Sequence, residues 1–302
     1  MLKRIFLFLV TNLAVMILIG IIIALLENFF GFRISGYGQS YTSIFIYAII
    51  VGFAGSFISL LLSKWSAKRA YNIDIINQND LSDLTSKERL VYDIVYDLSQ
   101  KNSIKMPEVG IYQSAEANAF ATGATKNKSL VAVSSGLLDL MNEKEIKGVI
   151  GHEMSHIFSG DMVTMVLLQG VINTFVIFLS RVIANIVDSY FSKDDNSGPS
   201  WIYYITSIVL DLVLGMLAST IVMWFSRYRE YKADEGSARL VGKENMISGL
   251  EALKKMINKA SDDKSKLATM KISTKRKSGL MALFSSHPDL DLRIEHLRNY
   301  NY

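Results

Sequence analysis

The residues most able to do chemistry together are His152, Glu153 and His156, which form the pattern HExxH. In a helix, residues four positions apart lie on one face, so the two imidazoles could bind a single Zn²⁺. Glu153 would then lie beside the metal, where it could accept a proton from the metal's water. The alternative is a helix with two unrelated surface histidines, but the spacing around a glutamate favours the metal site.

A catalytic zinc site requires three protein ligands and leaves a fourth position for water. Some zinc peptidases place the third ligand on the same segment, as HExxHxxGxxH, but here Ser159 and Met162 occupy the glycine and last histidine positions. Glu230 and Asp234 are better candidates, because they lie four residues apart on one face of a predicted helix. One carboxylate would bind the metal, and the other would accept a hydrogen bond from a ligand imidazole. Both could instead be ordinary surface acids on a charged helix.

Capping signals and short apolar runs predict the elements that would position these residues. Asn142 and Glu145 match a capping box and predict a helix over about 143–159, which contains HExxH. Thr85 and Glu88 form a second such signal, which opens a helix that ends near residue 100. Between these helices the sequence predicts three short strands and a short helix, at Glu108–Gln113, Ala117–Thr122, Ser129–Ser134 and Gly136–Met141.

The composition indicates a membrane protein with a sizeable part in water, because half of the residues are hydrophobic and a fifth are charged. A span needs about 20 apolar residues. The first candidate is too long for the apolar region of a signal peptide and is predicted to be a retained helix. The last two candidates could also form a hairpin that enters the bilayer only in part. Four stretches qualify: about Ile5–Leu26, Ile44–Leu62, Met162–Val187 and Trp201–Phe225.

The distribution of lysine and arginine predicts the orientation. Cations precede the first span and follow the second and fourth, whereas the two loops on the other side hold few. By the positive-inside rule, both termini and the HExxH segment face the cytoplasm. The chain is thus predicted to comprise two spans in 1–63, a catalytic region in 64–161, two further spans in 162–225 and a last cytoplasmic segment in 226–302.

Two features of the second half extend this scheme. Arg181 and Asp211 lie within the third and fourth spans, where they could form a structural pair between helices or line a substrate path. The fourth span is predicted to continue as a helix through Ser226–Leu240, because no glycine or proline interrupts it between Trp224 and Glu235, and this carries Glu230 out of the membrane. Further helices are predicted near Glu244–Asn258 and Leu290–Asn299.

Other classes of protein are excluded or disfavoured by composition. The chain has no cysteine, so it has neither disulfides nor a thiolate zinc site nor a cysteine nucleophile. Its net charge is only +4, and no basic stripe interleaved with aromatic residues occurs, so nucleic acid is not an expected partner.

Four motifs in this order make the sequence similar to a known family. It resembles the HtpX branch of the M48 metallopeptidases, and the resemblance extends over essentially the whole chain, including the predicted spans. The motifs that carry it are Gly151-His152-Glu153-Met154-Ser155-His156, the run Ser226–Asp234, Ser286-His287-Pro288 followed by Arg293-Ile294, and Asn118–Gly123 ahead of the active-site helix.

The resemblance implies an α-helical membrane protein with four transmembrane helices and a cytoplasmic α+β zincin-like metallopeptidase domain. It implies a zinc endopeptidase of the bacterial cytoplasmic membrane, with its active site facing the cytoplasm. Expected partners are the lipid bilayer and membrane-protein or unfolded polypeptide substrates, and the expected role is the removal of damaged or misfolded membrane proteins. One Zn²⁺ per chain is the implied cofactor.

Residue by residue, the resemblance assigns the zinc ligands to His152, His156 and Glu230, with Glu153 as the catalytic base. Asp234 would support a ligand imidazole rather than bind the metal. His287 would lie near the metal, either stabilising the oxyanion or serving as an extra ligand at rest. It could equally be a loop histidine with a structural partner.

The strand predicted at Ala117–Thr122 could bind substrate by edge addition, which reads the main chain of the substrate and gives loose sequence preference. Asn118, Ala119 and Phe120 are the predicted substrate-binding residues. A narrow-substrate peptidase related to those that process prenylated tails is one alternative function. A catalytically silent zinc-bound membrane scaffold is another, although an intact Glu153 argues against it. A transporter is suggested only by Arg181 and Asp211.

Overall fold

The structure is a computed structural model that describes residues 40–77, 81–191, 198–262 and 288–300, together with a few positions between 17 and 29. The chain divides into two compact units. One comprises Met1–Leu61 and Thr164–Val222, and the other comprises Leu62–Val163 and Met223–Tyr302. Most of the predicted first span, Ile5–Leu26, lies outside the described residues.

Among the described residues, three helices are long and apolar enough to cross a membrane. They are α2 (Tyr41–Tyr71), α6 (Asp161–Phe191) and α7 (Trp201–Val241). These helices contain the second, third and fourth predicted spans, and the predicted continuation of the fourth span is confirmed because α7 runs unbroken to Val241. The architecture is therefore mostly helical, with three candidate membrane helices in the part of the chain that is described.

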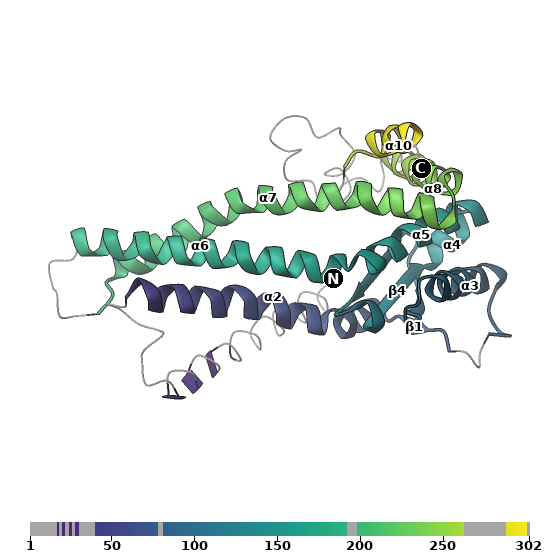
Figure 1. Cartoon of the computed structure of the whole chain (residues 1–302). Helices are drawn as coiled ribbons and strands as arrows, with labels where there is room; N and C mark the ends of the chain where they lie inside the picture. The colour runs from purple at the N-terminus through teal and green to yellow at the C-terminus, as the bar shows by residue number, and fades with distance from the viewer. Residues whose placement is uncertain are drawn as a thin grey trace. The chain divides into compact units, whose positions relative to one another are not determined.

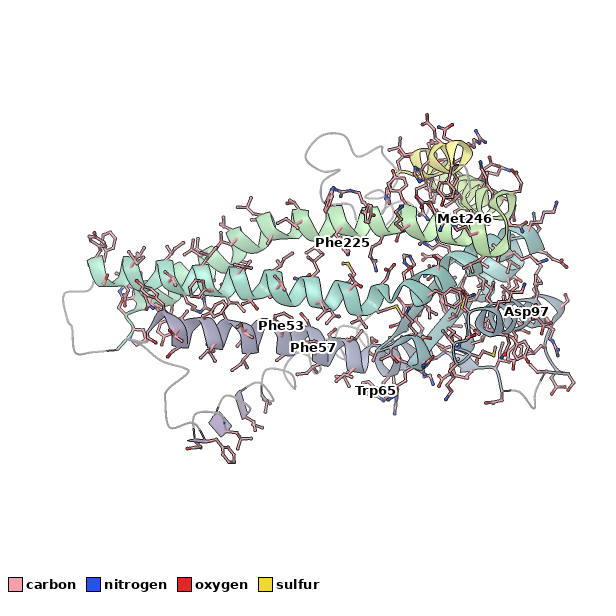
Figure 2. All side chains as sticks on the ribbon, in the orientation of Figure 1. Phe53, Phe57, Trp65, Asp97, Phe225 and Met246 are labelled. Atoms are coloured by element: carbon pink, nitrogen blue, oxygen red, sulfur yellow. The ribbon has the colours of Figure 1, made fainter. Side chains whose placement is uncertain are left out.

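The first unit is held together by close helix packing and by one ion pair. At Gly52 a Cβ would lie 2.7 Å from the backbone nitrogen of Thr174, so α2 and α6 approach closely at a residue without a side chain. The rings of Phe53 and Phe57, both labelled in Figure 2, stack along α2. Arg181 of α6 lies 3.0 Å from the Asp211 carboxylate of α7. This pairing favours the structural interpretation of the two charges.

The second unit contains a four-stranded sheet in the order β1-β2-β4-β3. Its middle strands β2 and β4 run parallel, while β1 and β3 pair antiparallel on either side. The strand β4 falls where the sequence predicted it, whereas the two-residue strand β1 was not predicted. The bounds are Asp74–Ile75 for β1, Glu108–Tyr112 for β2, Ala119–Gly123 for β3 and Ser129–Ser134 for β4.

Alternate residues of the strands face different helices, as expected from the two-residue period of a strand. Val131 and Val133 of β4 lie in the main core with residues of α3 (Ser86–Lys101) and α5 (Glu143–Ser159). Leu130 and Ala132 face the other way, into a smaller cluster that includes Tyr71 from the end of α2. The sheet is thus covered by helices on both faces, and Figure 1 shows α3 and α5 near the strands.

Both predicted capping boxes are present. Thr85 caps α3 and exchanges hydrogen bonds with Glu88, and Asn142 caps α5 in the same way with Glu145. Between them, the short helix α4 (Ser135–Leu140) follows β4 directly. The helix α5 ends at Gly160, whose φ of 69° lies in the left-handed region that favours glycine.

Two C-terminal helices complete the second unit. They are α8 (Lys243–Asp262) and α10 (Leu290–Asn299), which pack against each other as seen in Figure 1. The helix α8 also packs along α5, and the contact is close because a Cβ at Gly148 would lie 2.2 Å from the Asn245 carbonyl oxygen. This packing holds the HExxH helix between the sheet and the C-terminal helices.

Candidate metal centre

The histidines of HExxH lie on the last two turns of α5 with their side chains directed to the same point. The Nε2 atoms of His152 and His156 are 3.2 Å apart, and the two rings meet edge to face. Both side chains are largely shielded from solvent, because α5 packs between the sheet and the C-terminal helices. The prediction that one helical face presents both imidazoles is confirmed.

Glu230 of α7 brings a carboxylate to the same point from 74 residues further along the chain. Its Oε2 is 3.6 Å from His152 Nε2, and its Oε1 is 3.5 Å from His156 Nε2. One donor atom of each residue lies within 4.8 Å of the other two. Of the two acids that the sequence left as candidates, Glu230 is therefore the one beside both Nε2 atoms.

The donor set fits a zinc ion. Ligand atoms at about 2.0–2.1 Å from a tetrahedral Zn²⁺ are about 3.4 Å from one another. The separations of 3.2, 3.5 and 3.6 Å among the three side chains are close to this value. Two imidazole nitrogens and one carboxylate oxygen are donors that zinc accepts, and three such ligands leave one position for water or substrate.

Each imidazole is also held at its other nitrogen by a carboxylate. The Nδ1 atom of His152 lies 2.9 Å from Asp234 Oδ1, as predicted for the residue that supports a ligand. The Nδ1 atom of His156 lies 2.6 Å from Asp161 Oδ2, a contact that the sequence did not predict. A carboxylate at Nδ1 fixes the ring orientation and the tautomer that presents Nε2 to a metal.

Arg293 of α10 ties these acids together. Its Nε and Nη2 atoms donate to the two Asp234 oxygens at 2.7 and 2.6 Å, and its Nη1 lies 3.2 Å from Glu230 Oε2. The side chain is 7% exposed, and such a bidentate pair is geometrically specific. The sequence offered Arg293 only as part of a motif and gave it no role.

Charges and burial act in opposite directions on the pKa values in this cluster. Burial disfavours the charged imidazole of His152, but hydrogen bonds to Asp234 and Glu230 outweigh it and raise its pKa to about 9. Burial opposes protonation of His156 as well, yet its bonds to Asp161 and Glu230 raise its pKa. Burial would raise the pKa of Asp234, but Arg293 and His152 together hold it below its usual value.

Glu153, the predicted base, is oriented by the edge of the sheet. Its Oε2 accepts a hydrogen bond of 2.8 Å from the backbone N–H of Ala121 in β3. Among the described residues β3 pairs only with β4, so its other edge is open to further strand pairing. The Glu153 carboxylate is therefore held at the same edge that the sequence predicts for substrate.

The predicted substrate-binding residues take different positions on this strand. The Asn118 carbonyl accepts from Ser134 N–H, so main-chain groups of Asn118 and Phe120 point toward β4. By alternation, those of Ala119 and Ala121 point toward the open edge. The Phe120 ring packs against Tyr71 and Tyr112, which supports the strand from behind. His287, the other predicted catalytic residue, lies outside the described residues.

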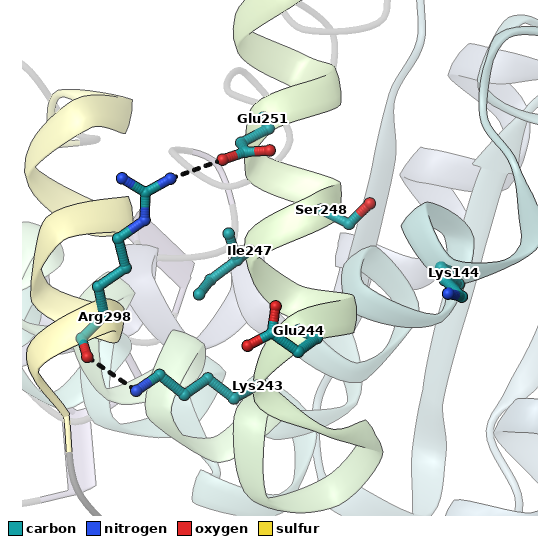
Figure 3. Close-up of a pocket in the computed structure, with 7 residues that line it drawn as sticks. All are labelled: Lys144, Lys243, Glu244, Ile247, Ser248, Glu251 and Arg298. Carbon is teal, nitrogen blue, oxygen red and sulfur yellow. Dashed lines mark hydrogen bonds and ion pairs between the residues drawn. The ribbon is translucent and has the colours of Figure 1, made fainter.

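A separate polar cavity of about 470 Å³ lies between α8, α10 and the start of α5 (Figure 3). Two contacts along its wall join α8 to α10: Arg298 bonds Glu251 at 2.9 Å, and Lys243 donates to the Arg298 carbonyl at 2.8 Å. None of the predicted site residues lines it. The candidate centre is therefore the His152, His156 and Glu230 cluster.

Comparisons with known proteins agree with this geometry. Peptidase family M48 matches residues 85–301. A "Protease HtpX homolog" from Methylacidiphilum infernorum is 48% identical, with 98% of each chain covered. A "Protease HtpX" from Tolumonas auensis is 47% identical, covering 98% of this chain and 99% of the relative.

The fold is also found among solved structures. The crystal structure of S. mikatae Ste24p aligns with a TM-score of 0.63 and 16% identity, over 99% of this chain and 67% of that one. At this identity the likeness concerns the fold alone. It agrees with a multi-pass helical protein that carries an α+β unit. The chain therefore belongs to Peptidase family M48 and is a metallopeptidase.

Proposed function

We propose that this chain is a membrane-integral endopeptidase that uses one Zn²⁺ held by His152, His156 and Glu230. The observation that carries the proposal is the convergence of one donor atom from each of these residues within 4.8 Å, with separations that suit a tetrahedral ion. Glu153, on the same helix as both histidines, is proposed as the catalytic base.

The chain's own residues would divide the work of peptide hydrolysis. When bound, zinc would supply Lewis acidity toward water and the substrate carbonyl. Glu153 would accept a proton from the attacking water at a carboxylate oxygen and deliver it to the departing amide nitrogen. Asp234 and Asp161 would hold the two ligand imidazoles in place, and Ala121 N–H would keep the Glu153 carboxylate at the edge of β3.

The open edge of β3 is the proposed substrate site. A substrate in extended conformation would pair with the main chain of Ala119 and with the carbonyl of Ala121, whose N–H holds Glu153. Phe120 would support the strand, and Asn118 would lie at its start. Such binding reads the backbone of the substrate, which suits damaged or misfolded membrane proteins of many sequences. His287 stays a proposed neighbour of the metal.

The proposed location is the bacterial cytoplasmic membrane, crossed four times, with the active site on the cytoplasmic side. The three long apolar helices support a multi-pass protein, and the excess of lysine and arginine after the second and fourth predicted spans supports the orientation.

Removal and return of the metal tests the proposal. Detergent-purified protein should cleave an unfolded substrate such as casein, lose this activity when zinc is removed by a chelator, and regain it when zinc is added. Glu230→Gln should lower the bound zinc, whereas Glu235→Gln, a neighbouring buried acid on the same helix, should not. Full zinc content in Glu230→Gln would contradict the ligand set, and chelator-resistant cleavage would contradict the chemistry.

A further inference from the structure

Two exposed tryptophans lie close, along their helices, to the two halves of the candidate site. Trp224 of α7 is 62% exposed and precedes Glu230 by six residues. Trp65 of α2 is 49% exposed and precedes Tyr71, whose ring contacts Phe120 of β3, also by six residues. At 1.5 Å rise per residue, Trp224 is about 9 Å along its helix axis from Glu230, and Trp65 is about 9 Å along its helix axis from Tyr71.

Both tryptophans have the surroundings of residues at the surface of a bilayer. Trp65 lies three residues after the apolar run that ends near Leu62 in α2, and Trp224 lies at the end of the run that ends near Phe225 in α7 (Figure 2 labels Trp65 and Phe225). Tryptophan and tyrosine are enriched where a membrane helix leaves the hydrocarbon, and lysine and arginine follow on the cytoplasmic side. Contact with lipid headgroups would account for exposed aromatic side chains of this size at both places.

Further aromatic and cationic side chains lie next to each tryptophan, on the side of the helix that leads away from the apolar run. In α7, Trp224 stacks on Tyr228 at 6.4 Å between ring centroids, and Lys232 lies 5.9 Å from the Tyr228 ring. In α2, the Arg69 guanidinium lies 5.7 Å from the Trp65 ring. Two helices that are distant in sequence thus each carry an exposed tryptophan followed by a cation that lies over an aromatic ring.

The HExxH helix gives a third, independent measure of how close the site lies to an apolar segment. His156 is separated by five residues from Asp161, where α6 begins, and the apolar residues Met162 and Val163 follow at once. Metal ligands on α5 and α7 and the substrate strand against α2 are therefore all within about two helical turns of an apolar segment.

We propose that the substrates of this site are chain segments immediately next to a membrane span, cut within the first few residues outside the bilayer. This inference rests on the proposed peptidase function and adds where the scissile bond lies. An extended chain advances about 3.3 Å per residue, so about three residues reach the height of the site. About four more would lie along β3, so a linker of about eight residues is long enough for cleavage.

A series of membrane-anchored substrates tests the inference. Each substrate has one apolar span, a polar unstructured linker of 4, 8, 16 or 24 residues, and a stably folded domain that blocks entry from the far end. The full-length protein and each substrate are reconstituted together in liposomes, and soluble casein serves as the control for peptidase activity. Cleaved bonds are mapped by mass spectrometry.

The expected result is cleavage of the 8-residue linker, with the bonds in the 16- and 24-residue linkers also clustered within about ten residues of the span. The inference would be overturned if casein were cleaved while the 8-residue linker stayed intact and the 24-residue linker were cut only in its distal half. That outcome would not contradict the peptidase function. Absence of casein cleavage would instead contradict the proposed function.

A second measurement tests whether Trp65 and Trp224 lie at the surface of the bilayer, and it does not require any substrate to be cut. The chain has three tryptophans, so variants that keep only Trp65 or only Trp224 can be made by replacing the others with phenylalanine. Their fluorescence should be quenched more by lipids brominated near the headgroup than by lipids brominated deep in the acyl chains. Strongest quenching by the deep probe, or by neither, would overturn the inference.

Discussion

At the residue scale, each of the two candidate ligand histidines contacts a carboxylate, and the two carboxylates come from different helices. Asp234 comes from α7, the helix that also carries Glu230, and is fully buried against Arg293. Asp161 is the first residue of α6 and lies 3.6 Å from Arg229 of α7 as well as 2.6 Å from His156. The orientation of each imidazole therefore depends on helices other than α5.

The Asp161→Asn substitution should weaken zinc binding about 10- to 100-fold, because His156 loses the carboxylate that fixes its ring and raises its basicity. Competition with a chelating dye would measure the zinc affinity. Asp139→Asn, at an exposed position on α4, is the matched control and should leave the affinity unchanged. Equal affinities for both variants and the wild type would show that Asp161 does not act on the metal site.

Arg293→Met should lower the free energy of unfolding by about 3–5 kcal/mol, because it leaves the buried carboxylates of Asp234 and Glu230 without their shared cation. Arg298→Met is the control: its pair with Glu251 is exposed, so its loss should cost about 0–1 kcal/mol. Denaturant unfolding of the detergent-solubilised, chelator-treated proteins would compare them. Similar losses for both would mean that the buried network contributes little.

Local signals in the sequence predicted the residues that come together at the candidate metal centre, but not the side chains that support them. HExxH and the Glu230/Asp234 pair are defined by helical spacing, which sequence shows directly. Asp161 lies five residues after His156, across the break at Gly160, so no helical face relates the two. Arg293 is 59 residues from Asp234, and only the packing of α10 brings them together.

At the scale of elements, the position of α5 depends on glycines that let other helices approach it. Besides Gly148 beneath Asn245, a Cβ at Gly151 would lie 2.6 Å from Ser237 Oγ, and one at Gly236 would lie 2.0 Å from Ser155 Oγ. Gly151 is thus a contact point between α5 and α7.

Gly148→Ala should lower stability by about 1–3 kcal/mol, because the new Cβ would meet backbone that cannot move without shifting α8. Thermal unfolding and zinc affinity would both be measured, since α5 carries two of the ligands. Gly55→Ala in α2, where no atom lies within 4 Å of the new Cβ, is the control and should not destabilise. A Gly148→Ala protein as stable as wild type would contradict the close packing of α5 and α8.

Prediction of the elements succeeded where a local signal fixes an end. The capping boxes at Asn142 and Thr85 place the starts of α5 and α3, and α5 ends at Ser159, as predicted. Strand β1 was missed because two residues carry no periodicity, and it exists through its pairing with β2. Strand β3 begins at Ala119, two residues later than predicted, since its start depends on the register with β4.

At the scale of the whole molecule, the long apolar helices also carry residues of the candidate site. The helix α7 runs without interruption from an apolar segment to Glu230 and Asp234, and α6 begins at Asp161 beside His156. Hydropathy predicted these helices well, because length and apolar composition are sequence properties. That the same helices supply the supports of the metal ligands follows only from the three-dimensional arrangement.

The most direct test of the central claim compares wild type with Glu153→Gln for casein cleavage and for zinc content per chain. The substitution keeps the shape of the side chain and removes the carboxylate that accepts the proton. We expect about one zinc per chain in both proteins, with cleavage by the wild type alone. Cleavage by both would contradict the role of Glu153, zinc without cleavage in both would favour a scaffold, and absence of zinc from both would contradict the metal centre itself.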